Sequence, residues 1–169
     1  MEKQDRFQAR GSSTIADYDI GCRIPSVPES VFGGYNWFLS AIRFCRVISV
    51  AYETLFSVTA SMNATESQLK AVNHVRGLLE SWRQSIPVDF RPREQLHKGR
   101  LTDRRTKLAA VLTQYYYYHL IIALERLTLL LDRGDEARRE ESKRDLMHAA
   151  RTIIELIRFV DAEPYTPIL

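Results

Sequence analysis

The sequence is poor in the residues that make turns and cross-links. Its 169 residues include 7 glycines, 6 prolines and 2 cysteines. So few glycines and prolines predict long elements with few turns between them. The two cysteines, Cys22 and Cys45, are too few for a disulfide framework or for a four-cysteine zinc site within this chain.

Long apolar runs are missing as well. The longest, from Tyr115 to Leu124, is interrupted by His119 and followed directly by Glu125. A membrane-spanning helix needs about 20 predominantly apolar residues. The residues from Met1 to Arg10 are mostly polar or charged, unlike a secretory signal. We therefore expect a soluble intracellular protein with no membrane partner.

Hydrophobic periodicity dominates what is present. Hydrophobic residues make up 45% of the chain and charged residues 27%, as in an ordinary globular domain. From Tyr35 onward they recur at steps of three and four, which predicts helices at residues 35–62, 65–86, 102–132 and 135–162. No segment alternates with period two, so no sheet is expected.

The predicted fold class is all-α, an antiparallel, bundle-like array of four long helices. Residues 1–34 are punctuated by Pro25, Pro28, Gly33 and Gly34, and we expect them to form an irregular N-terminal segment before a helical module at residues 35–169. The third helix is apolar nearly all round, which favours a place in the middle of the others.

The expected helix ends have recognisable signals. Thr65 followed by Gln68 fits a capping box at the start of the second helix. Thr102 or Asp103 is a good N-cap for the third helix. Pro87 ends the second helix, because the residue before a proline is disfavoured in α geometry.

Motifs that carry catalysis or bind cofactors are not found. The four histidines, His74, His97, His119 and His148, form no metal-binding helix pair, and no glycine-rich phosphate loop occurs. We expect no metal, no cofactor and no enzymatic activity. The alternative is a small-molecule-binding protein or an enzyme that uses Tyr115, His119 and Glu125. However, His119 and Glu125 are separated by about 120° around a helix, which argues against a shared site.

The run from Tyr115 to His119 is the strongest candidate for ligand contact. Successive helical residues point about 100° apart, so we expect two of the four tyrosines to pack inward and the others to lie at rims. An aromatic-lined cavity would use Tyr115, Tyr118 and His119, together with Trp82. Ordinary core packing is the alternative for all four residues.

Charge is the other candidate feature. Glu125 and Arg126 end the apolar run, and we expect them on the solvent side, with an internal ion pair or an interface contact as alternatives. The stretch from Asp89 to Lys107 holds seven basic and three acidic residues. It could contact phosphate, although a solvated loop is the alternative. Its basic residues are Arg91, Arg93, Lys98, Arg100, Arg104, Arg105 and Lys107.

Four phrases, taken in order, resemble a known family. They are Asp17-Tyr18-Asp19-Ile20 followed by Ile24-Pro25, then Trp82-Arg83-Gln84-Ser85-Ile86-Pro87, the tyrosine- and leucine-rich stretch from Tyr115 to Arg126, and Ala149-Ala150-Arg151. Together they are similar to the C-terminal part of the fungal-specific regulatory domain, or middle homology region, of zinc binuclear-cluster transcription factors.

The resemblance implies a nuclear regulatory module that acts through a protein partner, self-association or a small-molecule effector. The chain departs from the family pattern in three places. It cannot build the six-cysteine zinc cluster, so no sequence-specific DNA binding is expected of it alone. Leu127 stands where the family has proline, and Leu146 where it commonly has cysteine.

Overall fold

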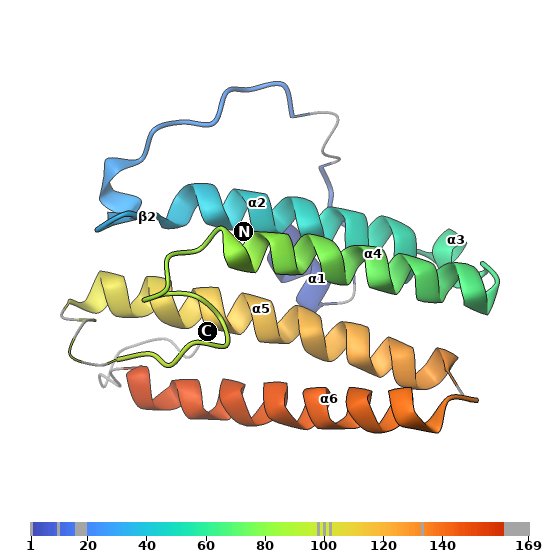
Figure 1. Ribbon diagram of the computed structural model, residues 1–169. Helices are drawn as coiled ribbons and strands as arrows, with labels where there is room; N and C mark the ends of the chain where they lie inside the picture. The colour runs from blue at the N-terminus through green and yellow to red at the C-terminus, as the bar shows by residue number, and fades with distance from the viewer. Residues whose placement is uncertain are drawn as a thin grey trace.

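Four long helices lie side by side in the computed structural model, which describes residues 2–9, 11–15, 20–97, 99, 101, 103–132 and 134–160 (Figure 1). They are α2 (Trp37–Ala51), α4 (Thr65–Gln84), α5 (Arg104–Leu131) and α6 (Glu136–Leu156). Helix α5 lies between α6 on one side and the pair α2 and α4 on the other. The predicted all-α class is confirmed.

The N-terminal residues are more regular than the sequence indicates. Helix α1 (Glu2–Gln8) packs on α2, and a 3₁₀ turn η2 (Pro28–Ser30) precedes a small antiparallel hairpin. The hairpin pairs β1 (Val31–Phe32) with β2 (Tyr35–Asn36), and Gly33 supplies its positive φ of 58°. The predictions of an irregular segment and of no sheet are therefore wrong at residues 2–8 and 31–36. Both elements are too short to show a hydrophobic period.

The first predicted helix, at residues 35–62, is divided in the structure. After α2, which Asn36 caps, the chain forms a π-helical turn η3 (Tyr52–Phe56) and a short helix α3 (Val58–Ser61). Ser57 separates them, because its backbone is extended (φ −69°, ψ 155°) and its side chain accepts a hydrogen bond from the Ala60 N–H. An N-cap serine thus interrupts the helix, although the spacing of the apolar residues along the sequence does not change.

The start of α4 differs from the predicted capping box. Ala64 is the N-cap residue, and Thr65 lies within the helix. The Gln68 side chain instead donates to the carbonyl oxygens of Ser61 at 3.3 Å and Asn63 at 2.7 Å. The same glutamine therefore ties α4 to the preceding turn rather than capping its own helix.

The starts of α5 and α6 are set by aspartates. The Asp103 side chain accepts from the Thr106 N–H, and Asp135 accepts from the Arg138 N–H. The predicted N-cap of the third helix is thus confirmed at Asp103. Helix α6 passes into a 3₁₀ turn η5 (Ile157–Phe159), and the last two residues of the fourth predicted helix, 161 and 162, lie outside the described residues.

The core forms around α5. Tyr116, Tyr117 and Tyr118 are all buried and Tyr115 is half-buried, so three of the four tyrosines pack inward rather than two. Phe44 of α2 is fully buried between Trp82 of α4 and Tyr116. Successive positions of α5 can be buried because neighbouring helices cover it from several sides. Within the described residues, no helix is long and apolar enough to span a bilayer.

Candidate functional site

The four aromatic residues predicted to line a cavity lie in three different contacts. Tyr115 and His119 stack with ring centroids 5.8 Å apart. Tyr118 meets His148 of α6 edge-on at 5.9 Å. Trp82 packs on Phe44 and donates its indole N–H to the Ser40 carbonyl oxygen at 2.8 Å. The structure brings Tyr115 and His119 together, and it places Tyr118 and Trp82 elsewhere in the core.

The buried tyrosine hydroxyls are held in the neutral form. Burial raises the pKa of Tyr116 to about 12 and that of Tyr117 to about 12. Burial also raises the pKa of Tyr118. Such phenols stay protonated near neutral pH, so they suit packing better than proton transfer.

His119 lies where α5 meets α1. The Phe7 ring of α1 contacts the His119 imidazole edge-on, with ring centroids 5.9 Å apart. The same Phe7 ring also contacts Phe56 edge-on, with centroids 5.3 Å apart. The Nδ1 atom of His119 is buried without a hydrogen-bond partner among the described residues, and burial lowers the pKa of the imidazole. A neutral histidine therefore forms part of the contact that holds α1.

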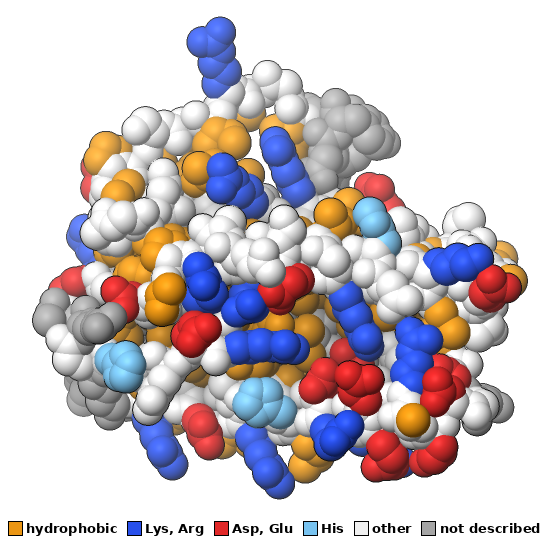
Figure 2. Space-filling model, in the orientation of Figure 1, with side chains coloured by type: hydrophobic (Ala, Val, Ile, Leu, Met, Phe, Trp, Pro, Cys, Tyr) orange, Lys and Arg blue, Asp and Glu red, His pale blue; other side chains and the backbone are white. Residues whose placement is uncertain are grey.

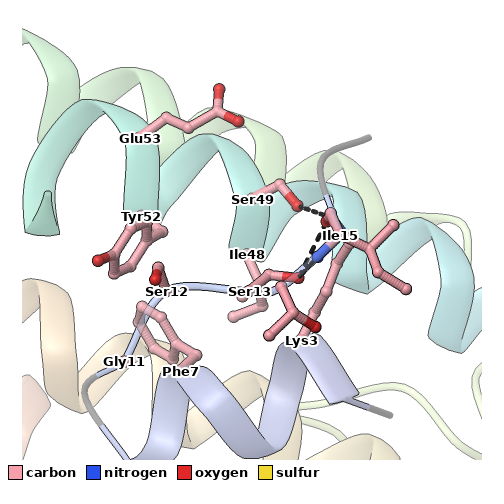
Figure 3. A pocket seen from close by; sticks show the side chains of 11 residues that line it. Lys3, Phe7, Gly11, Ser12, Ser13, Ile15, Ile48, Ser49, Tyr52 and Glu53 are labelled. Carbon is pink, nitrogen blue, oxygen red and sulfur yellow. Dashed lines mark hydrogen bonds between the residues drawn. The ribbon is translucent and has the colours of Figure 1, made fainter. Parts of the chain in front are cut away.

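A hollow of about 350 Å³ opens beside α1 (Figure 3). Its walls come from α1, residues 11–15, α2 and the start of η3. The Lys3 ammonium group closes one side by donating to the Ile15 carbonyl oxygen at 2.9 Å and to the Ser49 hydroxyl at 3.0 Å. None of the four predicted ligand residues lines this hollow.

The basic segment is partly used for local structure. Arg91 donates to the Ile86 carbonyl oxygen at 2.9 Å, and the Arg93 guanidinium lies 5.7 Å from the centre of the Tyr117 ring. Arg104 and Arg105 are exposed, and Lys107 is half-buried. Lys98 and Arg100 lie outside the described residues. A phosphate contact at this segment stays a prediction.

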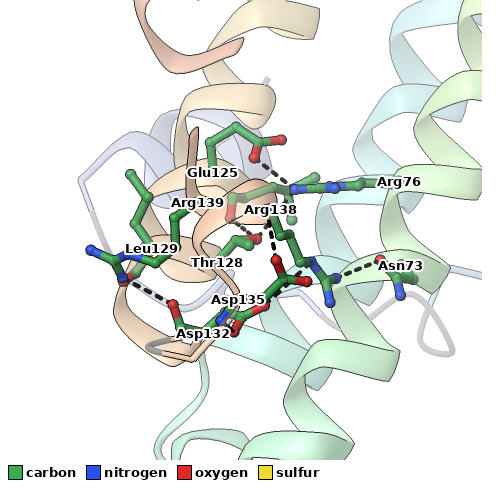
Figure 4. Close-up of polar contacts among 10 residues, drawn as sticks. Asn73, Arg76, Glu125, Thr128, Leu129, Asp132, Asp135, Arg138 and Arg139 are labelled. Carbon is green, nitrogen blue, oxygen red and sulfur yellow. Dashed lines mark hydrogen bonds and ion pairs between the residues drawn. The ribbon is translucent and has the colours of Figure 1, made fainter. Parts of the chain in front are cut away.

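A polar junction joins α4, α5 and α6 (Figure 4). Glu125 is only 2% exposed, and its carboxylate accepts a hydrogen bond of 2.7 Å from the Arg76 guanidinium. Arg76 also donates to the Thr128 hydroxyl at 3.2 Å. Burial raises the pKa of Glu125, which Arg76 and Ser142 of α6 lower in part. The expectation that Glu125 faces solvent is wrong, and the alternative of an internal ion pair is confirmed.

Sequence reasoning did not single out Arg76, although a signal was there. Arg76 stands four residues after Val72 and three before Leu79, both fully buried, so it lies on the apolar face of α4. A cation at such a position needs a buried anion. Glu125 supplies it, whereas its neighbour Arg126 is exposed as expected.

Two further arginines fix the turn between α5 and α6. Arg139 donates to the carbonyl oxygens of Leu129 at 3.0 Å and Asp132 at 2.9 Å, near the C-terminal end of α5. Arg138 lies 3.7 Å from the Asp132 carboxylate and donates to the Asn73 amide oxygen at 3.3 Å. Cations at the end of a helix satisfy its free carbonyl groups and oppose its dipole. The turn and α4 therefore hold α6 in a fixed position on α5.

The outer side of α6 is the exposed surface that this junction positions. On α6, Met147 is 53% exposed and Ile154 66%, and Ile157 of the adjoining turn η5 is 68% exposed. Single exposed hydrophobic residues are common, but several on one helix face often mark an interface. This outer side is the candidate functional site.

The described part of the chain is almost entirely helical, and the sequence is similar over part of its length to two fungal transcription factors. The chain is 29% identical over 97 residues to an "ABC-transporter-regulating transcription factor" of Aspergillus oryzae and 30% identical over 95 residues to one of Aspergillus fumigatus. The matches cover 57% and 56% of this chain but 10% of each relative. The chain thus matches about a tenth of the length of these curated relatives. No protein-family model matches the chain. No solved structure matches it either.

Replacing Glu125 should be costly, whereas replacing its neighbour should not. In Glu125→Ala the partly buried Arg76 guanidinium loses its partner, and we expect the free energy of unfolding to fall by about 2 kcal/mol. Arg126→Ala, one residue along and exposed, should change it by less than about 0.5 kcal/mol. Urea unfolding followed by circular dichroism measures both. Equal effects of the two substitutions would contradict the ion pair.

The partly buried His119 should make stability depend on pH. Its pKa is lower in the folded protein than the ordinary 6.5, so the folded state resists protonation. Lowering the pH from about 7 to about 5 should therefore reduce the stability of the wild type more than that of His119→Phe, which keeps an aromatic ring against Phe7. Urea midpoints at both pH values measure the difference. If the gap between the two proteins does not change with pH, this role of His119 is wrong.

Proposed function

We propose that this chain is a non-catalytic helical module that regulates transcription by binding another protein. The similarity to two fungal transcription factors carries the proposal. Transcription regulation takes place in the nucleus, so we propose that location for the chain. Contact with a protein, rather than with a membrane or directly with DNA, is the mode of action that we propose.

The arrangement of polar groups supports a non-catalytic role. His119 contacts α1, whereas Glu125 is bound to Arg76 of α4, so the acid and base candidates on α5 face different neighbours. General acid–base catalysis needs its groups within hydrogen-bond reach of one substrate. Among the described residues, no group of three or more His, Cys, Asp or Glu side chains could hold a metal ion. The small-molecule effector expected at Tyr115, Tyr118, His119 and Trp82 stays a prediction.

The exposed outer side of α6 supports action through a protein. Its hydrophobic side chains stand on a helix whose position is fixed by the polar junction described above. A rigid helix face loses little conformational entropy when a partner binds it. Binding through such a face requires no change in the rest of the fold.

A reporter assay tests the regulatory role. The chain is fused to a heterologous DNA-binding domain and expressed in a fungal host that carries the matching reporter gene. We expect the fusion to change reporter transcription several-fold relative to the DNA-binding domain alone, because the module brings its partner to the promoter.

The control is the same fusion with Phe44→Asp. A carboxylate at this fully buried position disrupts the core. This variant should return the reporter to the level of the DNA-binding domain alone. A wild-type fusion that is present in the nucleus and leaves the reporter unchanged would contradict the proposed function.

A further inference from the structure

The outer side of α6 has a regular chemical pattern. Arginines and hydrophobic residues alternate at steps of three and four along it, which places them on one helix face. We call these residues the α6 stripe: Arg144, Met147, Arg151 and Ile154 of α6, together with Arg158 of the 3₁₀ turn η5 that continues it.

The opposite face of α6 is the one that packs on α5. Ser142, Ala149 and Leu156 are its buried residues, and they recur every seven positions. A residue of the stripe lies about half a turn away from this seam, as Met147 does from Ala149. Packing on α5 therefore directs the whole stripe to the solvent, and all five of its residues are exposed.

The three arginines of the stripe are available for a partner. None of them forms a hydrogen bond or an ion pair with another residue in the described part of the chain. Lys143, beside the stripe, is instead bound to Glu140 and lies 3.7 Å from Glu136. Two exposed carboxylates lie next to the stripe and offset part of its positive charge: Glu155, and Glu140, whose pKa is lowered by Lys143 and in part by Arg144. In Figure 2, Lys and Arg side chains are spaced along the lower edge, where α6 lies.

We propose that the α6 stripe binds an acidic amphipathic helix of a partner protein. Apolar side chains of that helix would cover Met147 and Ile154, and its carboxylates would meet the arginines in bidentate pairs. Ile157, at the edge of the stripe, enlarges the apolar contact. The inference rests on the proposed function, since it specifies the partner through which the module acts.

Charge favours this partner over a second copy of the chain. A second α6 would bring three more arginines to the same contact, and like charges at an interface are unfavourable. A basic partner helix would meet the same repulsion. An acidic helix is attracted by the net positive charge of the stripe, and that attraction also speeds its encounter with the stripe.

Fluorescence anisotropy with a labelled synthetic helix tests the proposal. The probe is an amphipathic peptide of about 16 residues with leucines at steps of three and four and with Asp and Glu on their flanks. We expect it to bind the intact chain, and to bind several-fold more weakly as salt rises from about 50 mM to about 300 mM. A peptide with the same leucines but Lys in place of every acid should not bind.

Substitutions locate the binding on the stripe. Ile154→Ser and Arg151→Glu should each weaken binding by about tenfold, because they remove an apolar contact and reverse a charge. Val58→Ser on α3 and Arg43→Glu on α2 make comparable changes at other exposed positions and should leave binding unchanged. Circular dichroism of each variant confirms that the helices are intact.

Three outcomes would overturn the proposal. They are equal binding of the acidic and basic peptides, equal loss in the stripe and control variants, and sedimentation as a dimer that Ile154→Ser dissociates. A reporter effect that persists while the acidic peptide fails to bind would overturn the acidic partner alone and leave the regulatory role in place. A reporter that does not respond, with the peptide bound, would contradict the regulatory role.

Discussion

Burial of α5 is the constraint on which the rest of the structure depends. Its three successive tyrosines, Tyr116 to Tyr118, together with Leu120 and Leu124, would be costly to expose to water. One neighbouring helix can cover only part of such a surface, so α2 and α4 lie on one side and α6 on the other. Even α1 contributes, through Phe7 against His119. The layered arrangement follows from the all-round hydrophobicity of one helix.

Polar contacts decide how the outer helix sits on this centre. Hydrophobic packing on α5 favours contact but is non-directional, whereas the Arg76–Glu125 pair and the contacts of Arg138 and Arg139 have defined geometry. They join α4, α5 and the first turn of α6. With its position and rotation fixed, α6 presents Met147 and Ile154 to the solvent instead of burying them. The exposed face of the proposed site on α6 therefore depends on polar side chains that lie inside or beside the core.

The sequence predicts the long helices because each carries a sustained three-and-four pattern, and it offers Asp103 as a cap of α5. It does not predict α1, which has seven residues and one hydrophobic anchor, Phe7. The sequence also does not predict the break in the first expected helix at Ser57, because the apolar residues keep their spacing across it. The sequence places Glu125 at the surface, because its partner Arg76 is distant in sequence and only the fold brings the two together. The candidate site on α6 depends on which of its two faces packs on α5, which is a tertiary property.

Native-state hydrogen exchange tests the central place of α5 most directly. Amide protons exchange by local opening where a helix is weakly packed and only by global unfolding where it is the core. If α5 is the core, the amides of residues 113–125 exchange most slowly, with a free energy equal to that of global unfolding, and α1 and the outer turns of α6 exchange first. Slower exchange in α1 or α6 than in α5 would contradict the central place of α5.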